Sequence, residues 1–216
     1  MSNMQGSSLR WLGRAVVVMT AVLTLTACPS LGPRGEAPPS VDRARTLDRA
    51  GDYAGAAKVY ENLAAQNTGE QQNAYLLLAA RQYLRARQPD EAERVLASLV
   101  SPLTPDHAFE RQMLGVELAL VRNQPAEAWQ QISGIQQPTA VPAAVRYLGL
   151  RQRVAFETNR PVEAVRSAIA RERLITNADE RTQARSELLA QLRTAYERGV
   201  RVEPRAATDL IVRGWL

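Results

Sequence analysis

Arg87-Gln88-Pro89-Asp90-Glu91-Ala92 is one copy of a short motif that recurs through the chain at an interval of 36 residues. Four alanines, one at the end of each copy, therefore share a constant spacing. A fixed period of this length is typical of stacked helical hairpins. The other three copies are Gly51-Asp52-Tyr53-Ala54-Gly55-Ala56, Asn123-Gln124-Pro125-Ala126-Glu127-Ala128 and Asn159-Arg160-Pro161-Val162-Glu163-Ala164.

Three residue types explain why the second, third and fourth copies begin a helix. A proline at the first helical position loses no internal hydrogen bond and presets φ, as at Pro89, Pro125 and Pro161. The glutamate two residues later faces the positive end of the helix dipole. The alanine that follows is small enough to let two antiparallel helices cross at about 8 to 10 Å. Each motif therefore predicts the start of the second helix of a hairpin.

Apolar residues upstream of the motifs follow a helical spacing, with Leu78, Leu114 and Leu150 in one phase. The first copy, with Tyr60 one turn after Ala56, closely resembles a tetratricopeptide repeat (TPR). We expect an all-α fold, a TPR-like superhelical solenoid of about four helical hairpins plus capping helices. The expected helices cover 40–50, 53–66, 72–87, 89–100, 106–122, 125–135, 141–158 and 161–174, with a polar-faced capping helix over 178–198.

The first 27 residues have the features of a bacterial signal peptide. Arg10 and Arg14 precede an uncharged apolar stretch over 15–27, which is too short to span a bilayer. The string Leu25-Thr26-Ala27-Cys28 then provides a branched apolar residue, two small residues and a thiol, as the lipoprotein signal peptidase requires. Cys28, the only cysteine, is therefore the predicted lipidation site. The predicted recognition residues of the peptidase are Leu25, Thr26 and Ala27.

Three segments follow from this interpretation: a signal peptide over 1–27, the lipidated cysteine with a Pro/Gly-rich linker over 28–39, and a TPR-like helical domain over 40–216. Pro29 stands after the cysteine, and in lipoproteins of Gram-negative bacteria the absence of aspartate there usually directs transfer to the outer membrane. We expect a protein that is lipid-anchored at the periplasmic face of that membrane. Its proline-rich linker would reach about 30 Å.

Composition argues against nucleic acid as a partner. The full chain has 27 Lys or Arg and 22 Asp or Glu. The leader removes two arginines and no acid, so the remainder carries a net charge of only +3. Arginine supplies every basic residue except Lys58, which coding bias explains as well as ligand binding does. With its one thiol acylated, the chain has no disulfide, and packing must provide its stability.

The sequence offers few parts for an enzyme. His107, the only histidine, follows Pro105-Asp106 at an expected helix start and has no second histidine or free thiol as a partner. Ser186-Glu187 reverses the order of the glutamate-serine pair of lytic transglycosylases, and nothing suggests a second carboxyl for glycosidic cleavage. We therefore expect no catalysis, no metal and no cofactor.

A basic pattern lies on the first helices of the expected hairpins. Exposed arginines are ordinary on solvated surfaces, where acids such as Asp48 pair with them. On the hollow side of a solenoid, however, a row of them could hold an acidic peptide or glycan. Glu117 and Glu157 interrupt the row. The candidate partner-binding residues are Arg45, Arg49, Arg81, Arg85 and Arg153.

Several local strings, together with the anchor and the repeat, resemble the amino-terminal half of the LpoA-type penicillin-binding protein activators. The likeness covers roughly 40–216. The strings are Leu76-Leu77-Leu78-Ala79-Ala80-Arg81 with the following Glu91-Ala92, then Leu114-Gly115-Val116-Glu117-Leu118-Ala119-Leu120, and the closing Arg213-Gly214-Trp215-Leu216.

This resemblance implies an outer-membrane lipoprotein that reaches a bifunctional peptidoglycan synthase, a class A penicillin-binding protein, and stimulates its transpeptidase without catalysis of its own. In that family the activating contact is attributed to a second, carboxy-terminal domain that resembles a periplasmic ligand-binding protein. We expect that domain to be absent here. The apolar segment 206–216 ends without a helix cap, which suggests a shortened or split version of a longer protein.

Three other functions fit parts of the pattern. Lipid-anchored TPR-type proteins also assemble outer-membrane proteins or pili, and they would co-purify with barrel-assembly or secretin components. A cell-wall hydrolase would cleave peptidoglycan in a gel assay. A purely structural spacer would have no partner.

Overall fold

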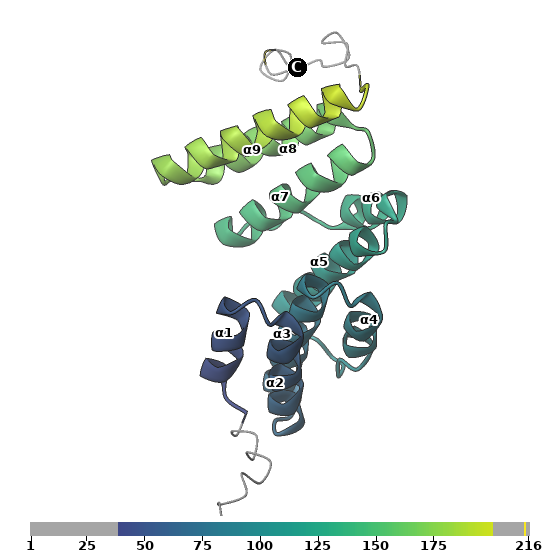
Figure 1. Ribbon diagram of the computed structural model, residues 1–216, viewed down its shortest axis with the longest axis vertical. Coiled ribbons are helices and arrows are strands. Elements are labelled where there is room, and N and C mark those ends of the chain that lie inside the picture. The colour runs from purple at the N-terminus through teal and green to yellow at the C-terminus, as the bar shows by residue number, and fades with distance from the viewer. Residues whose placement is uncertain (1–38, 201–213, 215–216) are drawn as a thin grey trace, which may run out of the picture. The chain divides into compact units, whose positions relative to one another are not determined.

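The computed structural model describes residues 39–200 and Gly214, and these residues contain nine helices and no strand (Figure 1). The prediction of an all-α array of hairpins is confirmed. The predicted signal peptide, Cys28, most of the linker and the apolar segment 206–216 lie outside the described residues, apart from Gly214. The helices are α1 (Val41–Arg49), α2 (Tyr53–Ala65), α3 (Gly69–Arg85), α4 (Pro89–Ala97), α5 (Pro105–Val121), α6 (Pro125–Gly134), α7 (Val141–Glu157), α8 (Pro161–Leu174) and α9 (Ala178–Glu197).

The helix starts marked by the repeated motif fall where they were predicted. Proline begins α4, α6 and α8, and the predicted glutamates lie in the first turns of those helices. The two largest differences, of three residues each, occur at ends without a motif: α3 begins at Gly69, and α4 ends at Ala97. Beyond α4, the buried amide of Asn73 bonds both backbone groups of Val100 at 2.8 Å, which takes that residue out of the helix.

Four turns of one geometry join the two helices of each hairpin. The left-handed residues Gly51, Arg87, Asn123 and Asn159 lie 36 residues apart, with φ between 56° and 81°. In each turn the next amide donates to a carbonyl five residues back, as Gln124 does to Ala119 at 2.8 Å. This bond satisfies a carbonyl at the helix end and reverses the chain. The second helix therefore starts at the same place in every repeat.

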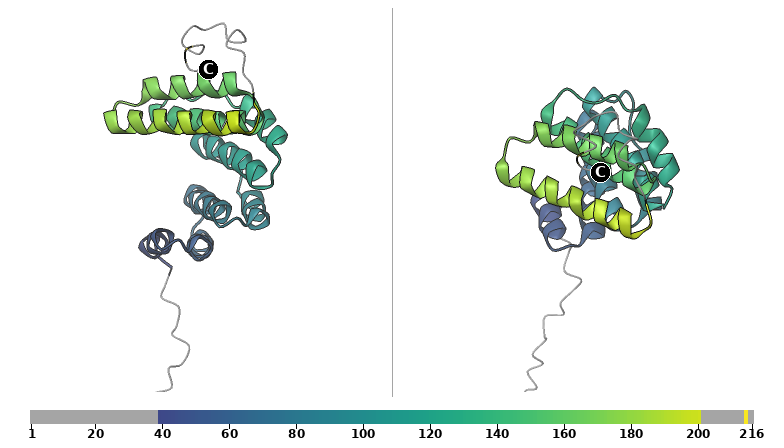
Figure 2. Two further views of the ribbon diagram at one scale, coloured as in Figure 1. Left: turned by 45° about the horizontal axis from the view of Figure 1, so that its top comes forward. Right: turned by 90° about the horizontal axis from the view of Figure 1, so that it is seen from above.

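Helices that follow one another along the chain pack against each other, and Figure 2 shows paired helices running in opposite directions. The four motif alanines are fully buried at 0% exposure, as their expected position at helix crossings requires. On α5, Leu114 belongs to the apolar cluster of α1–α4, whereas Met113 and Val116 belong to the next cluster. First helices such as α5 therefore connect one hairpin to the next through both of their faces. The fully buried alanines are Ala56, Ala92, Ala128 and Ala164.

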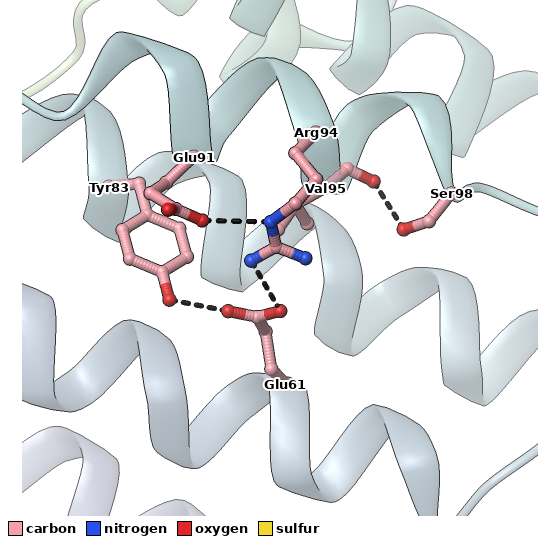
Figure 3. A network of polar contacts seen from close by, with 6 residues as sticks. All are labelled: Glu61, Tyr83, Glu91, Arg94, Val95 and Ser98. Carbon is pink, nitrogen blue, oxygen red and sulfur yellow. Dashed lines mark hydrogen bonds and ion pairs between the residues drawn. The ribbon is translucent and has the colours of Figure 1, made fainter.

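A polar network joins α2, α3 and α4 beside this core (Figure 3). The Glu61 carboxylate accepts hydrogen bonds from the Tyr83 hydroxyl and from Arg94, the latter at 2.8 Å. Arg94 also bonds Glu91 at 2.8 Å. Burial, with the hydrogen bond to Glu61, raises the pKa of Tyr83 above its ordinary value. The tyrosine therefore stays protonated and donates to Glu61 at any physiological pH.

Two leucine substitutions on α6 test the role of the motif alanine. Ala128→Leu adds volume at a crossing with no free space and should lower the free energy of unfolding by about 1–3 kcal/mol. Ala126→Leu, at an exposed position on the same helix, should change it by less than about 0.5 kcal/mol. Urea unfolding followed by circular dichroism measures both. Equal effects would show that the crossing is not tightly packed.

Candidate functional site

The candidate arginines form two rows that run across successive first helices. Row one contains positions 45, 81, 117 and 153, and row two contains positions 49, 85, 121 and 157. Members of a row are 36 residues apart and so share one position in each repeat. Row one reads Arg45, Arg81, Glu117 and Arg153, and row two reads Arg49, Arg85, Val121 and Glu157.

Three of the five candidate arginines already have partners within the chain. Arg81 forms an ion pair with Glu110 on α5. Arg85 pairs with Asp48 on α1, and its guanidinium lies 4.1 Å from the centre of the Tyr53 ring. Arg45 faces Asp42 at 3.7 Å on an exposed surface, a pair of small energetic value.

Arg49 and Arg153 are different. Both side chains are exposed, and neither makes a hydrogen bond or ion pair with a residue that the structure describes. The pairing is therefore uneven along the rows, and only these two candidates have a guanidinium free to bind a partner. Arg45, Arg81 and Arg85 instead fit the alternative interpretation of an ordinary surface on which arginines pair with nearby acids.

Glu110 on α5 holds three first helices together. Its carboxylate accepts from Arg81 on α3 and from Arg146 on α7, the latter at 2.6 Å. Burial alone would raise the pKa of Glu110, but the hydrogen bond from Arg146 and the positive charge of Arg81 outweigh it, so the pKa lies below its ordinary value. The ionised form of Glu110 therefore stabilises the fold.

Glu117 lies two turns further along α5 and has the opposite electrostatic balance. Burial raises its pKa above the ordinary value, and the charges of Arg153, Arg146 and Arg81 offset this only in part. Its carboxylate accepts no hydrogen bond from any described residue. An ionised acid without hydrogen-bond partners in a half-buried place costs free energy.

A pocket of about 540 Å³ opens beside Glu117. It is formed by the start of α2, the carboxyl ends of α3, α5 and α7, and the left-handed turns that follow α3 and α5. Apolar side chains of α3 and α5 make up part of its wall. Members of both rows therefore line one cavity. Its charged lining residues are Arg85, Arg87, Glu117, Arg153 and Glu157.

Aromatic rings also hold arginines, a feature that the sequence analysis missed. Trp129 on α6 has the guanidinium of Arg160 at 4.8 Å and that of Arg151 at 5.4 Å from its ring centre. Each contact is a cation–π interaction between neighbouring hairpins. Pairs of this kind cannot be found by spacing within one helix, because the partners come from α6, α7 and the start of α8.

The residues weighed for catalysis have structural positions. His107 lies in the first turn of α5, where its amide donates to the Thr104 hydroxyl at 3.3 Å. Ser186 donates to the Thr182 carbonyl at 3.0 Å, and Glu187 accepts from Arg171 at 3.2 Å. Among the described residues, no cluster of His, Cys, Asp and Glu could hold a metal ion, and no helix is long and apolar enough to cross a membrane.

The described residues thus define a class, the all-helical hairpin-repeat proteins. A family model described as "LppC putative lipoprotein" matches residues 52–216, more than half of the chain, and the chain belongs to this family. The search of curated proteins found no match. The resemblance to an LpoA-type amino-terminal half, predicted from the sequence, is therefore supported by an independent family match.

Solved structures show the same fold. The LpoA amino-terminal domain of E. coli superposes with a TM-score of 0.56 at 21% identity, covering 74% of this chain and 71% of that chain. The corresponding domain from Haemophilus influenzae gives 0.55 at 22% identity, with 74% and 72% covered. Full-length LpoA from H. influenzae gives 0.54 at 23% identity, and the match covers 74% of this chain but only 30% of that chain.

Two glutamine substitutions on α5 should separate the roles of its carboxylates. Glu110→Gln should lower the free energy of unfolding at pH 7 by about 1–2 kcal/mol, a value reduced because its arginine partners are partly exposed. Glu117→Gln removes an unfavourable charge and should leave stability unchanged or raise it.

The control is the pH dependence of the free energy of unfolding of the two variants and the wild type, measured by urea unfolding between pH 7 and pH 3. The pKa of Glu110 is lower in the folded state, so its stabilisation is complete above the ordinary value of about 4.3 and disappears as pH falls through the folded value. The pKa of Glu117 is raised, so its cost is present at neutral pH and disappears as pH falls toward about 4.3. Identical pH profiles for the two variants would contradict this assignment.

Proposed function

We propose that this chain is a lipid-anchored periplasmic scaffold that regulates peptidoglycan synthesis by a class A penicillin-binding protein. The membership of the LppC lipoprotein family carries the proposal. The fold shared with the LpoA amino-terminal domain and the predicted lipidation at Cys28 support it. In this proposal the chain sits at the periplasmic face of the outer membrane and does no catalysis.

An array of helical hairpins suits a scaffold. Each hairpin packs against its neighbours, so the array offers a long surface on which the same positions recur every 36 residues. The two rows are such a surface. A partner with acidic groups would gain most from Arg49 and Arg153, since their guanidinium groups bond no described residue and lose no internal ion pair on binding.

The test is capture of the synthase by variants with reversed charge. Arg49→Glu with Arg153→Glu should reduce capture of the class A penicillin-binding protein at least about tenfold in a pull-down at low salt. Arg173→Glu with Arg181→Glu makes the same charge change at exposed arginines outside the rows and should leave capture intact. Reversal at Arg81 or Arg85 is less informative, because it also breaks the pairs with Glu110 and Asp48.

Crosslinking in cells distinguishes the proposed partner from others. Recovery of a penicillin-binding protein supports the regulatory function. Recovery of barrel-assembly or secretin components instead would assign the chain to the assembly of outer-membrane proteins or pili, and would overturn the proposal.

The anchor has its own test. Cys28→Ser should abolish incorporation of labelled palmitate, because no other thiol is present to be acylated, and should leave the leader uncleaved, because the lipoprotein signal peptidase requires that thiol. Labelling with palmitate and the mass of the chain measure the two effects. Ser30→Ala, two residues along the linker, is the matched control. Continued labelling of Cys28→Ser would rule out this anchor.

A further inference from the structure

The pocket beside Glu117 contains charged groups of both signs that form no hydrogen bond or ion pair within the described residues. Glu117 and Glu157 supply two carboxylates, and Arg87 and Arg153 supply two guanidinium groups. None of these four side chains makes a hydrogen bond or ion pair with a residue in the part of the chain that the structure describes. Elsewhere on the same helices, Arg81, Glu110 and Arg146 satisfy one another.

The backbone explains why these four charges converge. Arg87 is the left-handed residue at the end of α3, and its φ of 58° directs the chain around the rim of the pocket. Glu117 and Arg153 are in the same row on α5 and α7. Glu157 is one turn beyond Arg153, so it lies on the same side of α7. The position of each charge is therefore set by the repeat.

The mixture of charges limits the ligand. A purely anionic ligand that reached the arginines would meet two carboxylates, and a purely cationic ligand would meet two guanidinium groups. A ligand with one charge of each sign leaves neither pair uncompensated. The pocket volume of about 540 Å³ suits a small molecule or a short peptide rather than a folded domain.

We propose that this pocket binds a short peptide with free ends, its ammonium group on Glu117 and Glu157 and its carboxylate on Arg87 and Arg153. Charge-assisted hydrogen bonds of this kind are about twice as strong as neutral ones, so both ends contribute to affinity. The apolar wall, which includes Leu84, Leu120 and Val121, packs against the body of the peptide. Arg85 takes no direct part, because Asp48 and the Tyr53 ring already hold it.

The inference deepens the proposed function, because Arg153 belongs to both sites, yet its test contains no synthase. Tri-alanine is titrated into the purified full chain, and binding is followed by NMR or calorimetry. Three blocked forms provide the comparison: N-acetylated, C-amidated, and blocked at both ends. Each single block should weaken binding about tenfold, and the doubly blocked peptide should not bind measurably.

Paired variants assign each end of the peptide to its partner. Glu117→Gln with Glu157→Gln should bind the free and N-acetylated peptides equally, while still distinguishing the C-amidated form. Arg87→Gln with Arg153→Gln should bind the free and C-amidated peptides equally, while still distinguishing the N-acetylated form. Arg173→Gln with Glu180→Gln, exposed residues outside the pocket, should behave as wild type.

The outcomes are decisive in both directions. Wild-type protein that does not bind free tri-alanine, or that binds all four peptides alike, overturns the inference, and this result does not depend on whether a variant folds. A wild-type chain that binds tri-alanine but captures no synthase would contradict the proposed function and support the pocket. A wild-type chain that captures the synthase but does not bind tri-alanine would overturn the pocket inference and leave the proposed function supported.

Discussion

Close approach of two helices at a fully buried alanine is the constraint on which the described structure depends. Ala56, Ala92, Ala128 and Ala164 have no exposed surface, and a left-handed turn before each second helix brings the alanine to its crossing. A larger residue there would separate the helices, and a different turn would rotate the crossing. Because both features recur every 36 residues, the second helix of every hairpin begins at the same position of the repeat.

The 36-residue period predicted the helix starts because the residues that repeat act locally, within one turn of a helix. Proline, glutamate and alanine each act within one turn of a helix, so their spacing located the starts of α4, α6 and α8. Boundaries set by distant contacts could not be predicted. The end of α4 depends on Asn73, which bonds Val100 from 27 residues away. The left-handed conformation of Arg87 was also hidden, since glycine or asparagine is usual at that position and arginine is not.

The candidate arginines show the same contrast between features that the sequence predicts and contacts that it does not. Their common phase follows from the sequence, and it placed Arg81 and Arg153 in one row with Glu117. Which of them is paired does not follow from phase. Arg81 is neutralised by Glu110, 29 residues away on another helix, and Arg85 by Asp48, 37 residues away. Only the contacts between helices distinguish an arginine that stabilises the fold from one that is free to bind a ligand.

Both apolar packing and ion pairs join neighbouring hairpins. Apolar clusters join neighbouring elements, with Leu114 of α5 in one and Met113 of α5 in the next. Glu110 adds a polar link from α5 to both α3 and α7. Glu117, on the same helix, makes no hydrogen bond or ion pair with a described residue, and burial raises its pKa. A half-buried carboxylate that lines a cavity and has no hydrogen-bond partner among the described residues is typical of a binding site.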